Sequence, residues 1–148
     1  MQDVDYQLFE ATVLEEMLSG TAGETQDREK ALLVLKRFGL LDYADTHPSR
    51  LSGGQKQRLS IALAYMSDAK ILFLDEPSSG LDEENMQLIS LAVIELAQKG
   101  CCVFVITHDY ELAARTFRSL LMIKEPKEIM RIPPERYNEK VLYEIFKS

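Results

Sequence analysis

An α/β fold is predicted for this chain of 148 residues by two short apolar runs and the segment between them. Residues 71–74 (ILFL) and 102–106 (CVFVI) are continuous runs typical of parallel strands that helices cover on both faces. The intervening segment has helical length, and two parallel strands joined by such a helix form a right-handed crossover unit. The first third of the chain has helical periodicity, so a helical part is expected to precede the sheet.

Three helices are expected in that first third. Thr12 and Glu15 have the spacing of a capping box and open a short helix, and residues 21–27 (TAGETQD) are predicted to be a loop. Apolar residues then recur at helical spacing over residues 28–38, until Gly39 ends the second helix. The third helix follows the segment LSGGQ, and its apolar face is predicted to contain Leu59, Ala62, Leu63 and Met66.

The remainder alternates between strands and helices. Asp82 is placed to cap a helix over residues 83–98, which Gly100 ends. After the second strand come a short helix and a third strand, residues 119–123, which residues 128–132 are expected to pair with as a hairpin. The tail, residues 135–147, has the pattern of a helix.

The composition restricts the class of protein. Seventeen basic residues against 24 acidic ones give a net charge of −7, which disfavours nucleic acid as a partner. The only cysteines, Cys101 and Cys102, are adjacent and suit neither a disulfide framework nor a zinc site, as expected for a reducing, cytoplasmic setting. No apolar run approaches the roughly 18 residues that span a bilayer. A membrane connection is therefore expected to depend on a partner protein.

Residues 51–55 (LSGGQ) are the first candidate site. Ser52 and Gln55 have capping-box spacing, and a purely structural cap is one interpretation. It leaves Gly53 and Gly54 unexplained, since each glycine in a helix costs about 0.5–1 kcal/mol relative to alanine. A helix N-terminus with bare N–H groups binds anions, so a phosphate site is the other interpretation.

Asp75, Glu76 and His108 are the second candidate site. Each follows one of the two apolar runs, and ligands of open α/β sheets bind at the carboxyl ends of the strands. One carboxylate can hold Mg²⁺ through water while its neighbour orients or deprotonates an attacking water, and a histidine there can bond a phosphate oxygen or that water. A solvated acidic turn and a structural histidine are the alternatives.

Taken together, LSGGQKQR, ILFLDEP, SSGLD and ITHD occur in an order that resembles the ATPase subunits of ABC transporters. The resemblance implies that Asp75 is the Walker B aspartate, Glu76 the catalytic glutamate and His108 the switch histidine. It also implies that Asp82 belongs to the D-loop. Residues 1–9 resemble a Q-loop with Gln2 as its glutamine, in a form most similar to the energy-coupling-factor ATPases.

The same resemblance implies a division of the chain. Residues 1–9 would be the Q-loop, 10–66 the helical signature subdomain, 67–124 the C-terminal part of a P-loop NTPase core, and 125–148 a hairpin and a C-terminal helix. The sequence contains no G-x-x-x-x-G-K-[ST] loop, since no glycine is followed by lysine. The chain therefore resembles the C-terminal part of an ABC ATPase that lacks the Walker A loop. A truncated piece of a working ATPase and a natural short protein are both compatible with this.

The family mechanism assigns roles to these residues. Two ATPase domains meet head to tail around ATP and Mg²⁺, so the signature residues of this chain would contact ATP held by a second ATPase subunit; they are Ser52, Gly53, Gly54 and Gln55. Glu76 would polarise water and His108 would stabilise developing charge. Asp75 would support Mg²⁺ with Gln2, and Asp82 would cross the dimer interface.

The resemblance further implies a transmembrane transporter subunit as partner, import of a small molecule such as a vitamin or metal ion, and a peripheral position on the inner face of the membrane. Without the Walker A loop, the isolated chain is expected to bind nucleotide weakly and to show no ATPase activity. The family sheet order would place the missing strand between the strands at 102–106 and 119–123, and the gap is expected to cause self-association. The alternatives are a non-enzymatic regulatory or assembly module, and an ABC-type ATPase of chromosome maintenance, DNA repair or translation.

Overall fold

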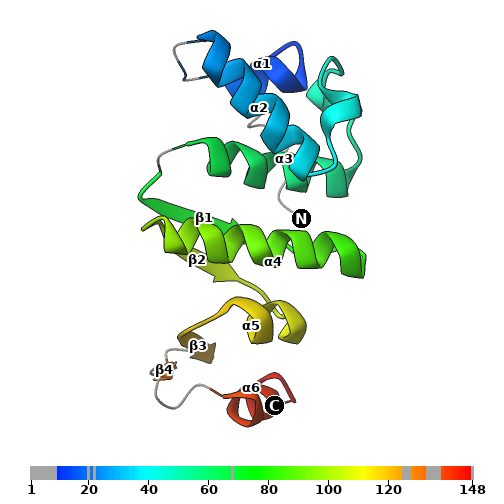
Figure 1. Ribbon diagram of the computed structural model, residues 1–148. Helices are drawn as coiled ribbons and strands as arrows, with labels where there is room; N and C mark the ends of the chain where they lie inside the picture. Colours follow the sequence, from blue (N-terminus) through cyan, green and yellow to red (C-terminus); the bar gives the residue numbers. More distant parts are fainter. Residues whose placement is uncertain are drawn as a thin grey trace.

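The computed structural model describes residues 10–19, 21, 23–67, 69–124, 128–132 and 138–147. Figure 1 shows the elements following one another along one long direction, from a helical end to a C-terminal end that holds a hairpin and the last helix. The helical end contains α1 (Val13–Leu18), α2 (Thr25–Arg37), the short 3₁₀ turns η2 (Leu41–Tyr43) and η3 (Pro48–Arg50), and α3 (Gly53–Met66). The centre contains β1 (Ile71–Asp75), α4 (Glu83–Gln98) and β2 (Cys102–Ile106). The far end contains α5 (Tyr110–Thr116), β3 (Leu120–Lys124), β4 (Glu128–Ile132) and α6 (Glu139–Lys147).

The predicted α/β crossover unit is present. β1 and β2 pair in parallel over five residue pairs, from Ile71 opposite Cys102 to Asp75 opposite Ile106, and α4 joins them. The predicted hairpin is also confirmed, because β3 and β4 pair antiparallel. Among the described strands, β2 and β3 are not paired, and the two sheets are separate.

The helix starts follow local capping hydrogen bonds. Thr12 caps α1 as expected, with its Oγ1 accepting from the Glu15 N–H at 3.1 Å. The expectation that residues 21–27 form a loop is wrong for its last part, because α2 begins at Thr25. The Glu24 N–H donates to the Asp27 carboxylate at 3.3 Å, which favours an earlier helix start. The apolar spacing alone could not reveal this start, since the first turn is exposed.

The core lies where α1, α2 and α3 meet α4 and one face of β1. The apolar residues expected to face inward from α2 and its end are fully buried, as are Leu59 and Ala62 of α3. Ile61 is also buried, although it lies off the predicted face of α3. This helix is thus covered on more than one side, which fits its position between α2 and α4.

The expectation that helices cover both faces of the strands is wrong for the described part of the chain. Leu72, Leu74, Val103 and Val105 pack against the core, but the alternate residues do not. We call this second side of the β1–β2 sheet the open face; its residues Ile71, Phe73, Phe104 and Ile106 are 59%, 69%, 49% and 62% exposed. The rings of Phe73 and Phe104 stack there with centroids 5.0 Å apart.

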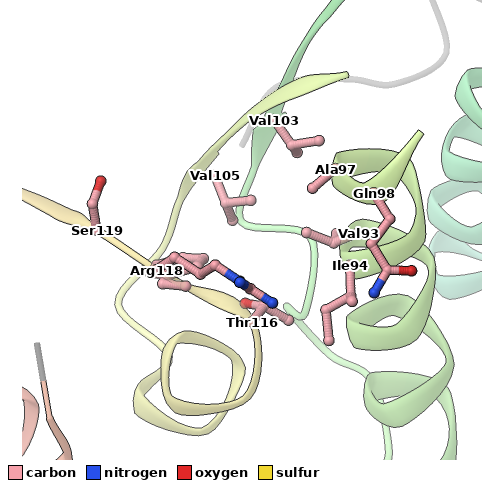
Figure 2. Close-up of a pocket in the computed structure, with 10 residues that line it drawn as sticks. Val93, Ile94, Ala97, Gln98, Val103, Val105, Thr116, Arg118 and Ser119 are labelled. Carbon is pink, nitrogen blue, oxygen red and sulfur yellow. The ribbon is translucent and has the colours of Figure 1, made fainter. Parts of the chain in front are cut away.

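A cavity of about 480 Å³ lies between β2, α4 and the segment that leads into β3. Figure 2 shows Val103 and Val105 of β2 with Val93 and Ala97 of α4 on one side of it, and Arg118 reaching toward the same space. Residues 116–119, which lead into β3, form the remaining wall.

The C-terminal helix packs on α5. Tyr110 contacts Tyr143 and Phe146 of α6 edge-on, with ring centroids 6.2 and 6.0 Å apart. The tail is thus helical from Glu139 to Lys147, within the predicted range, although residues 133–137 lie outside the described ranges. None of the helices in the described ranges combines the length and the apolar character that crossing a bilayer requires.

Candidate functional site

The turn that opens α3, residues 51–55, has both features expected from its sequence. The Ser52 hydroxyl accepts from the Gln55 N–H at 3.3 Å, and Gln55 Oε1 accepts from the Ser52 N–H at 2.8 Å. This reciprocal pair is a capping box, so the structural interpretation of Ser52 and Gln55 is correct. We call residues 51–55 the signature turn.

The two glycines of the signature turn need a different explanation. Their N–H groups belong to the first helical turn, which has no intrahelical acceptor, and neither donates to another described residue. Gly53 is exposed, and a Cβ added there would meet nothing within 4 Å. A Cβ on Gly54 would meet Leu81 Cδ2 at 3.3 Å, so Gly54 allows the segment after β1 to approach closely. The bare amides of both glycines fit an anion such as a phosphate.

Glu76 lies immediately after β1 in an unusual backbone conformation. Its φ is +47°, in the left-handed region that non-glycine residues rarely adopt and that costs of order 1–3 kcal/mol. The Glu76 N–H donates to the Ile106 carbonyl at 2.8 Å and so extends the β1–β2 ladder by one bond. Strain of this kind persists only where surrounding contacts hold it, and it often marks a functional position.

The Glu76 carboxylate is held by the end of β2. Its Oε1 lies 2.8 Å from His108 Nδ1 and accepts from the His108 N–H at 3.2 Å. Its Oε2 accepts from the Thr107 hydroxyl at 3.2 Å. The hydrogen bond to Glu76, with its negative charge, raises the pKa of His108 above its ordinary value. The His108 side chain is 87% exposed, so its ring remains accessible to a ligand.

The two aspartates differ in their surroundings. Asp75 ends β1 and is exposed, on the same side of the sheet as the open face. Asp82 caps α4, with Oδ1 accepting from the Asn85 N–H at 2.9 Å and from Asn85 Nδ2 at 2.7 Å. Within the described ranges there is no cluster of three or more side chains placed to hold a metal ion. A Mg²⁺ beside Asp75 would therefore take most of its oxygen ligands from phosphate and water.

The fold brings the two candidate sites together. The Gln57 side chain of α3 donates to the Glu76 carbonyl at 2.7 Å, and Gly54 faces Leu81. The helix that begins in the signature turn is thus joined to the end of β1 by the contact from Gln57 to Glu76. Gln2 lies outside the described residues. Sequence reasoning missed Gln57 and Thr107, because polar residues beside a motif give no signal until their distant partners are known.

The arrangement combines an exposed helix N-terminus with a carboxylate–histidine pair at the carboxyl ends of parallel strands. A family model described as ABC transporter matches residues 2–79 of the chain. The chain belongs to the ABC transporter family. The described elements accordingly form part of the ABC ATPase fold, a P-loop NTPase core with a helical part in front of it.

Relatives of this ABC chain include proteins named for import. YkoD of Bacillus subtilis, described as an HMP/thiamine import ATP-binding protein, is 37% identical over 124 residues, covering 84% of this chain and 23% of YkoD. The glutamate/aspartate import ATP-binding protein GltL of Escherichia coli K12 is 36% identical over 110 residues, covering 74% of this chain and 46% of GltL. The chain thus spans about a quarter to a half of the length of these relatives.

Solved structures of ABC ATPases share the fold. That of cbiO1 from Clostridium perfringens, part of the cbiONQ transporter complex, has a TM-score of 0.70 and 29% identity, covering 96% of this ABC chain and 57% of cbiO1. The ATP-binding cassette MJ0796 in a dimeric post-hydrolysis state bound to ADP and Pi has a TM-score of 0.73 and 26% identity, covering 90% of this chain and 61% of MJ0796.

Proposed function

We propose that this chain is part of the ATP-hydrolysing subunit of an ABC transporter, in which two such subunits meet head to tail around ATP and Mg²⁺. The observations that carry the proposal are the bare amides of Gly53 and Gly54 in the first turn of α3 and the Glu76–His108 pair at the strand ends. The dimeric MJ0796 structure bound to ADP and Pi supports a paired arrangement. The family membership supports ATP as the nucleotide.

In this proposal, each site residue has its own role in ATP binding and hydrolysis. The amides of Gly53 and Gly54, with Ser52 and Gln55 fixing the turn, bind the γ-phosphate of ATP that the second subunit carries. On the nucleotide of its own subunit, Glu76 orients and polarises the attacking water. His108, with its raised pKa, donates to the phosphate oxygen where negative charge develops. Asp82 crosses to the partner at the dimer interface.

Mg²⁺, when bound, neutralises charge on the phosphate oxygens. Asp75 fits as its protein carboxylate because it is exposed at the end of β1. Gln2, from a Q-loop over residues 1–9, is the second contact. The helical part, residues 10–66, moves on closure of the dimer against residues 67–124, while residues 125–148 complete the C-terminal end.

Import of a small molecule is the proposed task. YkoD and GltL are both named as import ATP-binding proteins, and cbiO1 is part of a transporter complex. The Q-loop resemblance adds the energy-coupling-factor type, with a vitamin or a metal ion as cargo. A transmembrane subunit would hold this chain at the cytoplasmic face of the membrane.

The affinity of this chain for nucleotide should be low when it is alone. The sequence contains no G-x-x-x-x-G-K-[ST] motif, which is the loop that cradles the phosphates of the nucleotide in P-loop NTPases. We expect no measurable ATPase activity from the isolated chain. Turnover by the wild-type chain that disappears in Glu76→Gln would contradict this expectation.

The proposal is tested by ATP-dependent association with a complete ABC ATPase domain, measured by calorimetry. The chain is titrated with Mg-ATP alone and then with the complete domain, with and without Mg-ATP. We expect weak binding in the first titration and association in the second only when Mg-ATP is present. Association that is equally strong with and without Mg-ATP would support a non-enzymatic assembly module instead.

A matched pair of variants at Gly53 makes the test specific. Gly53→Asp places a negative charge where the phosphate should bind, while an acidic residue in the first helical turn favours the helix. Gly53→Asn has nearly the same shape without the charge, and both fit because the position is open. The aspartate should abolish ATP-dependent association and the asparagine should retain most of it. Equal behaviour of the two variants would overturn the proposed phosphate contact.

A further inference from the structure

Gln57 forms a long-range contact that the mechanism above does not use. Its side-chain Nε2 donates to the backbone carbonyl of Glu76 at 2.7 Å, across 19 residues of sequence and in a partly buried position. Gln57 lies one turn into α3, two residues after the signature turn. The contact therefore joins the helix that carries Gly53 and Gly54 to the residue that carries the proposed catalytic carboxylate.

The Glu76 backbone requires such support. Its positive φ is unfavourable for a residue with a side chain, and the conformation persists only if neighbouring groups hold it. The N–H is held by Ile106 and the carbonyl by the Ser79 N–H at 3.1 Å as well as by Gln57. Among the described residues, Gln57 is the only one of these three partners that belongs to the helical part.

The neighbouring side chain on α3 supports the other end of the same segment. Arg58 donates through NH1 to the Asn85 side chain, and Asn85 in turn contacts Asp82. Gln57 thus contacts the first residue of the segment 76–82, and Arg58 is connected to its last residue through Asn85. A shift of α3 should therefore move residues 76–82 with it, unless these hydrogen bonds break.

We propose that Gln57 is a positioning residue that holds Glu76 in its left-handed conformation and so aims the Glu76 carboxylate at His108. The same hydrogen bond links the signature turn of this chain, which faces the partner's nucleotide, to the carboxylate that acts on its own nucleotide. The positioning role stands without the proposed function, whereas the link between the two nucleotide sites rests on it.

NMR of the full chain tests the positioning role without any nucleotide. The His108 N–H donates to Glu76 Oε1 and its ring contacts the same carboxylate, so the His108 amide and ring signals report where that carboxylate points. The charged groups that act on His108 are Glu76 and Asp109. His47 is an internal reference, because it caps η3 at a separate place.

Gln57→Met removes the donor and keeps the length of the side chain. We expect an upfield shift of the His108 amide proton and a fall of the His108 titration midpoint toward its ordinary value, with the His47 amide signal unchanged. Gln87→Met, the same substitution on the exposed side of α4, should change neither signal. If Gln57→Met folds and leaves both His108 signals at their wild-type values, the proposal is wrong.

Gln57→Asn provides a second variant that keeps the amide but shortens its reach. It should fold as the wild type does and show the same two shifts; unchanged His108 signals would also overturn the proposal. In the ATP-dependent complex, wild-type His108 signals should change on association, and Gln57→Met should associate without that change. A complex that never forms refutes the proposed function alone, since the nucleotide-free measurements stand independently.

Discussion

His108 Nδ1 lies 2.8 Å from Glu76 Oε1, although the two residues are 32 positions apart in the sequence. The parallel pairing of β1 with β2 brings them together, because Asp75 and Ile106 are opposite each other and the chain continues from both at the same sheet edge. The distance is that of a charge-assisted hydrogen bond. The pair therefore couples the protonation of the ring to the position of the carboxylate.

The first prediction concerns this pair. Glu76→Gln removes the negative charge, so the pKa of His108 should fall toward its ordinary value of 6.5, as measured by NMR titration of the ring. Since the folded-state pKa is raised, the pair stabilises the fold fully below pH 6.5, and this stabilisation is lost as the pH rises through the folded-state pKa. Urea unfolding at several pH values should show this loss in the wild type and not in Glu76→Gln. An unchanged His108 midpoint in the variant would contradict the pairing.

The second prediction concerns the ion pair between α2 and α4. Arg37 donates to both carboxylate oxygens of Glu95, at 2.8 and 2.6 Å, and the Tyr65 hydroxyl donates to Glu95 Oε2 at 2.8 Å. Both charged side chains are 35% exposed, so solvent screens the pair. We expect a coupling of about 0.5–1 kcal/mol from a double-mutant cycle of Arg37→Met and Glu95→Gln in urea unfolding. A coupling of zero at pH 7 would show that the bidentate contact does not form in solution.

The same ion pair should depend on pH. Hydrogen bonds from Arg37 and then Tyr65 lower the pKa of Glu95 below its ordinary value of 4.5. The contribution to stability is therefore present above pH 4.5 and lost as the pH falls through the lower, folded-state pKa. The double-mutant coupling should vanish below that pKa. Persistence of the full coupling in strong acid would argue against an ionic origin.

The third prediction concerns the helical core. Leu59→Ala should destabilise the chain by about 3 kcal/mol, because Leu59 of α3 is fully buried and its loss leaves a cavity. Leu33→Ala on α2 is the matched control: Leu33 is 68% exposed, and its loss should change the free energy of unfolding by less than about 0.5 kcal/mol. Denaturant unfolding measures both. Equal effects would show that α3 is not packed against α2 and α4 as described.

The fourth prediction concerns the open face. The stacked rings of Phe73 and Phe104, with Ile71 and Ile106 beside them, form an exposed apolar patch of the kind that drives association. The isolated chain should self-associate with increasing concentration, and Phe73→Ser should weaken the association about tenfold or more, as measured by sedimentation velocity. Leu33→Ser, at a similarly exposed leucine elsewhere, should leave it unchanged. A wild-type chain that remains a monodisperse monomer would contradict this.

Much of the fold could be predicted from the sequence because the deciding interactions are short. Thr12, Ser52 and Asp82 each cap a helix through a hydrogen bond to an N–H group three residues on. Parallel pairing followed from two apolar runs separated by one helix. The start of α2 was misplaced because its first turn is exposed and carries no apolar periodicity.

The candidate site was predictable only in part. The order of LSGGQ, the acidic pair and His108 indicated the family, and the family model confirmed it. The roles of the individual residues remain proposals. Gln57 escaped prediction because its donor and the Glu76 carbonyl are 19 residues apart, and only the docking of α3 beside the end of β1 brings them within 2.7 Å.

The sequence alone determined which segments become helices or strands, where most helices begin, and which family the chain belongs to, because caps, periodicity and motifs act within a few residues. The tertiary structure alone decided which strand face is covered, how Glu76 is held in a left-handed conformation, and which side chains link α3 to the strand ends. Those outcomes depend on how separate elements pack, and on contacts spanning 19 to 58 residues that local patterns do not encode.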